Sequence, residues 1–292
     1  MNVAKLPKKY QKPPPPQEQE LPGSQQEMRP HPLDEDTDRK PSGKLMDKVA
    51  IVTGGDSGIG RSVALLFARE GADICIVYLN EDEDARNTAA RIEQSGRRAI
   101  LCAGDIGDPE FCVQCVEQTI ENFGKIDIVV NNAAEQDEIS GVEDLTPEKV
   151  ERTFKTNIFG CFYLTKAALP HLKEGASIIN TTSVQAYDPS YELMDYACTK
   201  AAILNFTRSL AKQLAPKKIR VNAVAPGPIW TPLIPASFPA EHLKDFGKKT
   251  LFKRPGQPAE VAPSYLFLAA LSESSYITGE VIHVNGGQAM PG

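Results

Sequence analysis

From about residue 48 onward, the chain alternates between two kinds of hydrophobic pattern. One kind is a short, near-continuously apolar run, which is typical of a strand buried on both faces. Seven such runs occupy residues 49–52, 73–79, 98–102, 126–131, 177–182, 219–225 and 281–285. Longer helical patterns occupy residues 61–70, 81–95, 108–122, 146–172, 194–214 and 258–271. The alternation predicts an α/β fold: a single doubly wound sheet of about seven parallel strands, with helices on both faces.

Residues 1–45 have a different composition from the rest of the chain. They hold nine of the 23 prolines and five glutamines, and few apolar residues. Such a segment buries too little apolar surface to offset the entropy cost of ordering it. We therefore expect a disordered or polyproline-II tail over 1–45 and one folded domain over 46–292. The alternative is an arm that lies over a neighbouring subunit.

Composition excludes several classes of protein. The chain has 292 residues, of which 41% are hydrophobic, enough for one large core or two small ones. A net charge of −6 gives no electrostatic support for binding nucleic acid. No run of about 18 apolar residues could span a membrane. Six scattered cysteines, with no secretory signal in the first residues, predict reduced thiols in a cytoplasm, and four dispersed histidines indicate no metal site.

A glycine-rich stretch, T-G-x-x-x-G-x-G over residues 53–60, joins the first predicted strand to the first predicted helix. Glycines at such a turn let the backbone approach a pyrophosphate, and the helix start offers N–H groups and a positive dipole end to the phosphates. The alternative is an ordinary tight loop. The candidate cofactor-binding residues of this stretch are Gly54, Asp56, Ser57, Gly58, Ile59 and Gly60.

Further candidate cofactor residues follow the next strands. Tyr78, Asn80 and Glu81 lie about 20 residues after the glycines, where an acidic residue holds the adenosine ribose in many dinucleotide sites. Because the region is acidic and so is the glycine turn, we expect NAD in preference to NADP, which stays possible; otherwise these acids are only a solvated helix start. We expect the adenine and the flat cofactor to lie against Asp105, Ile106, Asn132, Ala133 and Ala134.

The candidate chemistry is carried by Tyr196 and Lys200, which lie four apart and therefore on one helix face. A nearby ammonium favours the phenolate and lowers the pKa of a tyrosine, which makes it a better general acid–base. Ser183 closes the preceding strand and could hydrogen-bond the same substrate oxygen, although a serine there is often only a turn former. Asn157 lies inside a long predicted helix, where asparagine is locally unfavourable.

Two other features have less specific interpretations. Residues 228–254 combine prolines with apolar side chains and are typical of a lid that closes over a substrate. Tyr187, Tyr191 and Met194 either line the substrate pocket or are ordinary packing residues. Cys112-x-x-Cys115 falls at a helix start, so it is either a redox pair or two buried thiols on one face.

Taken in this order, the motifs resemble the short-chain dehydrogenase/reductase family over about residues 45–288. The resemblance rests on the glycine turn, on residues 131–134 as an N-N-A-G-like motif with Ala134 in place of the usual glycine, and on a catalytic tetrad and a motif for the nicotinamide end. The matching tetrad is Asn157, Ser183, Tyr196 and Lys200, and the nicotinamide-end residues are Pro226, Gly227, Ile229 and Thr231. Within the family, the chain is similar to the bacterial glucose/ribitol-dehydrogenase-like, general-stress branch, which also carries a proline-rich N-terminal extension.

The resemblance implies a Rossmann-type fold and a role for each tetrad residue. Tyr196 would exchange a proton with the substrate oxygen, Lys200 would bind the nicotinamide ribose and lower the pKa of Tyr196, Ser183 would orient the substrate, and Asn157 would hold a water. The implied activity is NAD(P)-dependent oxidation of a secondary alcohol, polyol or sugar, or reduction of the matching carbonyl. The alternatives are an NADPH-dependent carbonyl reductase and a nucleotide-binding protein without turnover. The resemblance also implies a homotetramer with the helices of Asn157 and Tyr196 at an interface.

Overall fold

A seven-stranded parallel sheet forms the centre of the computed structural model, which describes residues 6–290. The strand order is β3-β2-β1-β4-β5-β6-β7, and every pairing is parallel. The strands are β1 (Val49–Thr53), β2 (Asp73–Tyr78), β3 (Ala99–Ala103), β4 (Ile128–Asn131), β5 (Ser177–Thr181), β6 (Arg220–Pro226) and β7 (Val281–Val284). The predicted fold class is confirmed. The order reverses between β1 and β4, which is where ligands of such sheets bind.

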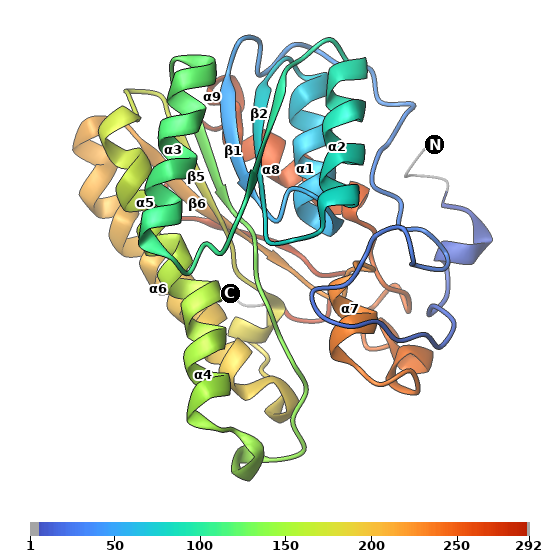
Figure 1. The fold of residues 1–292 in the computed structure, drawn as a ribbon. Helices are drawn as coiled ribbons and strands as arrows, with labels where there is room; N and C mark the ends of the chain where they lie inside the picture. The colour runs from blue at the N-terminus through green and yellow to red at the C-terminus, as the bar shows by residue number, and fades with distance from the viewer. Residues whose placement is uncertain (1–5, 291–292) are drawn as a thin grey trace.

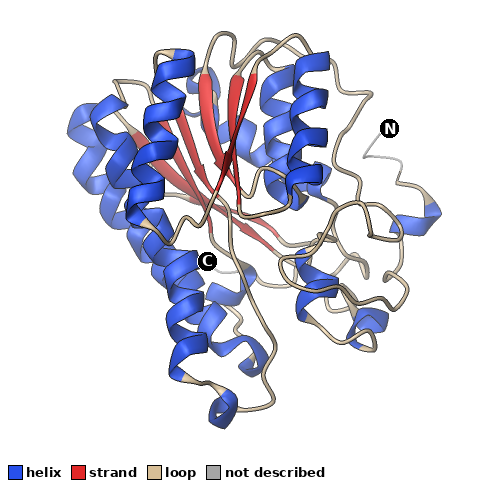
Figure 2. Cartoon of the chain, in the orientation of Figure 1, coloured by secondary structure: helices blue, strands red, loops and turns tan. Residues whose placement is uncertain are grey.

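Helices cover both faces of the sheet, as Figures 1 and 2 show. On one face lie α1 (Gly58–Arg69), α2 (Asp82–Gln94) and α8 (Pro258–Ala269), and on the other lie α3 (Pro109–Phe123), α5 (Gly160–Ala168) and α6 (Met194–Leu214). Shorter helices are α4 (Pro147–Phe154), α7 (Leu233–Ser237) and α9 (Leu271–Ser274). Each face has its own core because side chains alternate along a strand: Ala50 and Val52 of β1 enter one core and Ile51 the other.

The long helix predicted over 146–172 is interrupted. Its start is as expected, with the Thr146 side chain accepting a hydrogen bond from the backbone N–H of Lys149. After α4, however, Lys155–Phe159 form a π-helical turn before α5 begins. Such turns carry a wider backbone repeat and are frequent at functional sites. The turn contains Asn157, and asparagine is an unfavourable residue inside a regular α-helix.

The proline-rich extension packs on its own domain, which differs from the expectation of a disordered tail. Leu6, Tyr10 and Leu33 form a buried cluster with Ala259 of α8, and Met28 is fully buried. In Figure 1 the extension is the dark blue trace that runs beside α7. Composition predicted disorder because apolar residues are few, but those few pack against apolar residues of the domain. Residues 1–5 of the predicted tail lie outside the described part of the chain.

No helix among residues 6–290 is both long enough and apolar enough to cross a membrane.

The glycine turn generates the first prediction, because Gly60 has no room for a side chain. A Cβ built on Gly60 would lie 2.0 Å from the backbone oxygen of Gly54 and 2.7 Å from the Asn132 amide nitrogen. We expect Gly60→Ala to lower the free energy of unfolding by at least about 2 kcal/mol, because a backbone atom must move. Urea denaturation measures the change.

The matched control is Gly141→Ala, whose Cβ would approach the carboxylate end of the flexible Glu143 side chain at 2.6 Å. That side chain can move, so we expect a change under about 1 kcal/mol. Equal stability of Gly60→Ala and wild type would show that the turn is not packed as described.

Candidate functional site

A cavity of about 980 Å³ lies at the carboxyl ends of the strands. This volume is at the upper end of the range of about 300–1,000 Å³ for ligand pockets. Most of the residues that the sequence singled out line it: Gly54, Asp56, Ser57, Gly58, Ile59, Tyr78, Glu81, Asp105, Ile106, Asn132, Ala133, Ala134, Ser183, Tyr196, Lys200, Pro226, Gly227, Ile229 and Thr231. Gly60, Asn80 and Asn157 are not part of the lining. The structure therefore brings together motifs that lie up to 177 residues apart in the sequence.

The glycine turn leaves an open cradle that only small residues can form. Gly54 and Gly58 have φ values of +62° and +52°, a region that glycine adopts without strain. A Cβ on Gly54 would lie 3.1 Å from the Asn132 amide nitrogen. The turn is also tied to the next strand, because Asn132 Nδ2 donates to the Thr53 carbonyl at 3.0 Å. A backbone cradle at the first turn of α1 fits the phosphates of a dinucleotide.

Carboxyl groups gather at the end of the cavity beside the glycine turn. Asp56 is buried, which raises its pKa to about 6. Burial also raises the pKa of Glu81, as does the neighbouring carboxylate of Asp84. The hydroxyl of Tyr78 donates to Asp82 at 2.7 Å, and burial together with that bond raises the pKa of Tyr78 to about 12. A ligand that binds here meets acidic side chains, which fits an uncharged ribose hydroxyl better than a phosphate.

Tyr196 and Lys200 lie at the inner end of the cavity, both in α6 and both buried. The ammonium of Lys200 donates to the carbonyl oxygen of Thr181 at 3.0 Å and lies over the ring of Tyr196, 5.2 Å from its centroid. Burial lowers the pKa of Lys200 to about 8. Burial also raises the pKa of Tyr196 to about 12, and a hydrogen bond with Ser183 opposes the rise.

The expected direction of the Tyr196 pKa shift is therefore wrong for this structure. Sequence reasoning placed an ammonium beside the phenol and predicted a lower pKa. In the structure, removal of the phenolate from water dominates, and the same burial favours the uncharged amine of Lys200. At neutral pH the phenol is protonated, which is the form that can donate a proton.

Asn157 lies behind the cavity wall in the π-helical turn, where its side-chain amide makes three hydrogen bonds. Its Oδ1 accepts from the backbone N–H of Glu135 at 2.8 Å, and its Nδ2 donates to the Glu135 carbonyl at 2.8 Å and to Thr199 Oγ1 at 3.1 Å. Glu135 lines the cavity. In this structure Asn157 therefore positions a cavity-lining backbone segment.

Sequence reasoning missed several residues that line or border the cavity. Gln136 is buried and donates to Ser237 Oγ at 2.8 Å. His242 Nδ1 lies 3.0 Å from a carboxylate oxygen of Glu138. Further lining residues missed are Leu21, Pro22, Thr181, Gln185 and Glu192. None of these residues belongs to a motif with a recognisable spacing. The one available signal was that residues 135–138 directly follow the N-N-A-A stretch.

The predicted lid, residues 228–254, forms part of the cavity wall. It contains α7 and a 3-10 turn, His242–Asp245, and its apolar residues Trp230, Ile234 and Leu243 are buried around Met28. Of the aromatic residues predicted nearby, Tyr187 packs against the ring of His283 at a centroid distance of 4.7 Å, and Tyr191 is exposed. Neither Tyr187, Tyr191 nor Met194 is part of the cavity lining, which favours their interpretation as ordinary packing or surface residues.

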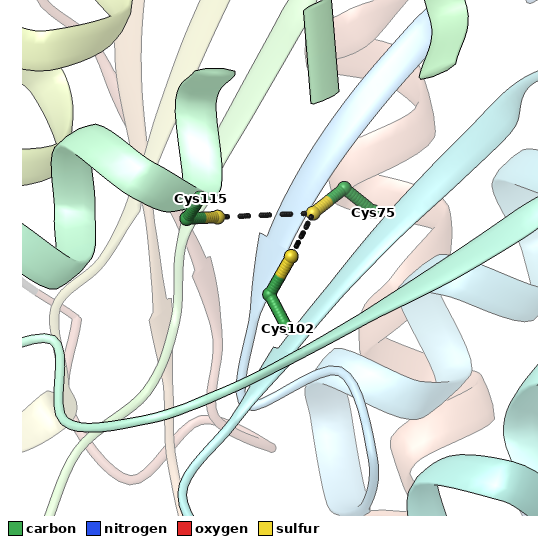
Figure 3. A group of neighbouring side chains, drawn as sticks. All are labelled: Cys75, Cys102 and Cys115. Atoms are coloured by element: carbon green, nitrogen blue, oxygen red, sulfur yellow. Dashed lines mark hydrogen bonds between the residues drawn. The ribbon is translucent and has the colours of Figure 1, made fainter. Parts of the chain in front are cut away.

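All six cysteines have free thiols, and Cys112 and Cys115 do not face the same partner. Cys112 donates to the carbonyl of Ile106 at 3.2 Å, whereas Cys115 approaches Cys75 of β2 at 3.8 Å. Figure 3 shows Cys115 with Cys75 and Cys102, which itself lies 3.5 Å from Cys75. Burial raises the pKa of Cys112 to about 12. The arrangement favours the interpretation as buried core thiols, because a redox pair needs an accessible thiolate.

The buried carboxyl of Asp56 generates a prediction about stability. Its pKa is about 6 in the folded chain against an ordinary 3.8, so the folded state holds a proton that the unfolded state releases between those values. The free energy of unfolding should fall as pH rises from about 4 to about 6, by about 3 kcal/mol at most. Asp56→Asn cannot ionise and should lack this loss.

Urea denaturation of the ligand-free wild type and Asp56→Asn at pH 4.5 and 7.5 measures the difference. We expect the variant to be relatively more stable at pH 7.5 than at pH 4.5. An identical pH dependence of the two proteins would contradict the burial of an ionisable Asp56.

Comparison with known proteins supports a specific family. A family model described as enoyl-(acyl carrier protein) reductase matches residues 54–289. General stress protein 39 of Bacillus subtilis is 54% identical, over 91% of this chain and 93% of its own length. An NADPH-dependent aldehyde reductase of Arabidopsis thaliana is 52% identical, over 91% and 94% of the two chains. A glucose and ribitol dehydrogenase of Daucus carota is 49% identical, over 95% and 98%.

Solved structures agree in fold. A short-chain dehydrogenase from Burkholderia cenocepacia in complex with NADP superposes with a TM-score of 0.79 at 34% identity, covering 84% of this chain and 99% of that chain. A 3-ketoacyl-(acyl-carrier-protein) reductase from Brucella melitensis complexed with NADH gives a TM-score of 0.77 at 32% identity, covering 84% and 100%. With the parallel sheet and the assembled cavity, these matches show that the chain is an oxidoreductase that belongs to the short-chain dehydrogenase/reductase family.

Proposed function

We propose that this protein transfers a hydride between NAD(H) and a secondary alcohol, polyol or sugar, or the matching carbonyl, with Tyr196 as the proton-exchanging group. The observation that carries the proposal is the meeting of Tyr196, Lys200 and Ser183 at the inner end of one cavity whose other end is the glycine cradle. A nicotinamide dinucleotide fits that cradle because Gly54 and Gly58, which line the cavity, expose the backbone there without side chains.

The chain's own residues account for the proton. When bound, the nicotinamide supplies or takes up the hydride. Tyr196 Oη, protonated at neutral pH in this structure, donates its proton to a carbonyl oxygen in the reductive direction; in the oxidative direction its deprotonated phenolate form accepts the proton of the alcohol. Ser183 holds the same oxygen by a hydrogen bond. Lys200, anchored to the Thr181 carbonyl, keeps a cation next to the phenol whenever it is protonated.

The preference for NAD(H) rests on the acidic side chains near the glycine turn. Asp56 and Glu81 line the cavity, and Asp84 lies close enough to raise the pKa of Glu81. A 2′-phosphate would add negative charge to a region where burial already raises the pKa of the Asp56 carboxyl. A ribose hydroxyl can instead donate a hydrogen bond to a carboxylate.

The proposed substrate class is supported by the mixed character of the cavity wall. The apolar side chains of Leu193, Ile234 and Phe238 belong to this wall, and so do several polar groups. The polar side chains are Gln136, Gln185, Glu192 and His242. A ligand with several hydroxyl groups can satisfy both donors and acceptors of such a wall. This supports a polyol or sugar over a plain hydrocarbon ketone.

The second candidate is an NADPH-dependent carbonyl reductase. The 52%-identical relative named as an NADPH-dependent aldehyde reductase supports this candidate. A nucleotide-binding role without turnover would leave unexplained why a buried phenol, Tyr196, lies beside Lys200 in the cavity wall.

We also propose a homotetramer, supported by an exposed aromatic face on α5 and its preceding turn. Phe159 and Phe162 are 44% and 50% exposed, and Phe162 lies 4.3 Å from Phe206 of α6, centroid to centroid. Exposed apolar groups gathered at one place mark interaction surfaces more often than free surface.

Tyr196→Phe tests the chemistry. The variant keeps the ring and loses only the proton-exchanging oxygen, so we expect kcat to fall by about 10²–10⁴-fold on a substrate found in a panel of polyols, sugars and aldehydes. The dissociation constant for NADH, measured by isothermal titration, should stay within about threefold because the phenol oxygen is not part of the phosphate cradle.

Wild-type kcat in Tyr196→Phe would contradict the assigned role of Tyr196. Tight NADH binding by the wild type with no turnover on any member of the panel would instead favour the non-catalytic alternative.

Phe162→Asp tests the assembly. A carboxylate on the exposed aromatic face should separate the subunits, so light scattering after gel filtration should report a mass below that of the wild-type assembly. Tyr276→Asp is the matched control, because Tyr276 is fully exposed and follows α9, which packs with α8 on the opposite side of the sheet from α5. A monomeric wild type, or a Phe162→Asp assembly of unchanged mass, would rule out this interface.

A further inference from the structure

Part of the proline-rich extension lies between the lid and the glycine turn. We refer to residues 17–34 as the strap. It runs beside α7 in Figure 1, and two of its residues, Leu21 and Pro22, line the cavity. Leu21 and Pro22, which thus complete the cavity wall, precede the glycine-rich stretch at residue 53 by more than 30 residues.

The strap is fastened to the lid by backbone and side-chain contacts. The N–H of Gln19 donates to the carbonyl of Pro235 at 2.9 Å, and Glu18 accepts from the N–H of Ala240 at 2.9 Å. Trp230 Nε1 donates to the carbonyl of Pro30 at 2.8 Å. Met28 is fully buried among the lid residues Trp230, Ile234 and Leu243. The lid therefore has its apolar side covered by the strap.

The strap also contacts the glycine turn through one side chain. Gln25 Oε1 accepts from the N–H of Gly58 at 3.0 Å, and the backbone N–H of Gln25 donates to Asp84 at 2.7 Å. Gly58 is the first residue of α1, and the residue before it, Ser57, provides no side-chain cap. Gln25 is 6% exposed, so it caps the helix from a distance of 33 residues in a place that water barely reaches.

A cap from Gln25 has a consequence for an anion at the same helix start. The first N–H groups of a helix lack partners within the helix and point toward its N-terminal end. Because Gln25 satisfies the N–H of Gly58 and fixes the turn, the following N–H group of Ile59, which lines the cavity, is held in place for a phosphate oxygen. The neutral amide caps without adding charge, whereas a carboxylate at this position would oppose both the phosphates and Asp84.

We propose that the strap is part of the dinucleotide site and that Gln25 is a positioning residue for it. Gln25 holds the start of α1 in its binding conformation, while Leu21 and Pro22 form the outer wall of the cavity. The affinity for a nicotinamide dinucleotide then depends on the strap, although no strap residue takes part in the proton transfer. This inference rests on the proposed function for the identity of the ligand.

The test compares full-length Gln25→Ala, Gln25→Glu and wild type by isothermal titration with NADH and with NADPH. For the cofactor that the wild type prefers, we expect the dissociation constant to rise about tenfold in Gln25→Ala and further in Gln25→Glu. At saturating cofactor, kcat should stay within about twofold of wild type in Gln25→Ala. A merely structural role would lower the melting temperature without this separation of affinity from kcat.

Two controls separate the local effect from loss of packing. Gln11→Ala changes the same residue type in the extension but outside the strap, where the Gln11 side chain bonds the carbonyl of Leu6. This variant should bind NADH like the wild type. The fluorescence of Trp230, the single tryptophan of the chain, reports whether the strap still covers the lid. Its emission maximum should be unchanged in Gln25→Ala.

Each remaining outcome has a definite meaning. Wild-type affinity in Gln25→Ala overturns this proposal alone, and tighter binding overturns it too, because Gln25 would then compete with the phosphates. A wild type that binds neither NADH nor NADPH overturns the proposed function and this proposal together. If Gln25→Ala fails to fold, Leu21→Ser decides: the proposal requires a raised dissociation constant for this wall residue and fails if affinity is unchanged.

Discussion

The site depends on a set of hydrogen bonds that joins the carboxyl ends of β1, β4 and β5. Asn132 donates to the carbonyl of Thr53 at 3.0 Å, and Thr181 Oγ1 donates to the amide oxygen of Asn132 at 3.3 Å. The carbonyl of Thr181 then accepts from the ammonium of Lys200. These bonds tie the glycine turn at one end of the cavity to the helix that carries Tyr196 at the other. A shift of any strand end would separate the cradle from the proton-exchanging group.

Burial gives this arrangement its electrostatic character. Tyr196 and Lys200 are both enclosed, so each is pushed toward its uncharged form: the pKa of the phenol rises and that of the amine falls. Burial has the same effect on Asp56 at the opposite end. The cavity therefore holds several groups whose protonation a charged ligand would change, which is how functional sites commonly differ from structural ones.

Much of the fold and the inner site could be predicted from the sequence because the information is local. Near-continuous apolar runs marked the strands, and the residues directly after them, such as Asn132 and Ser183, had to meet at one edge of a parallel sheet. The pKa of Tyr196 could not be predicted, since its direction depends on how completely the fold encloses the ring and on which acceptor Lys200 finds. The packing of residues 6–45 on the domain could not be predicted for a related reason. Composition counts apolar residues, whereas Met28 packs against Trp230, 202 residues away, and Gln25 bonds Gly58, 33 residues away.

The direct measurement of the central claim is isothermal titration of the wild-type protein with NADH and NADPH at pH 7. The account predicts one dinucleotide per chain, with NADH bound more tightly than NADPH because Asp56 and Glu81 line the cavity near the glycine turn. Tighter binding of NADPH would contradict the assignment of the acidic groups and favour the reductase alternative. No binding of either dinucleotide would contradict the cavity's assignment as a cofactor site.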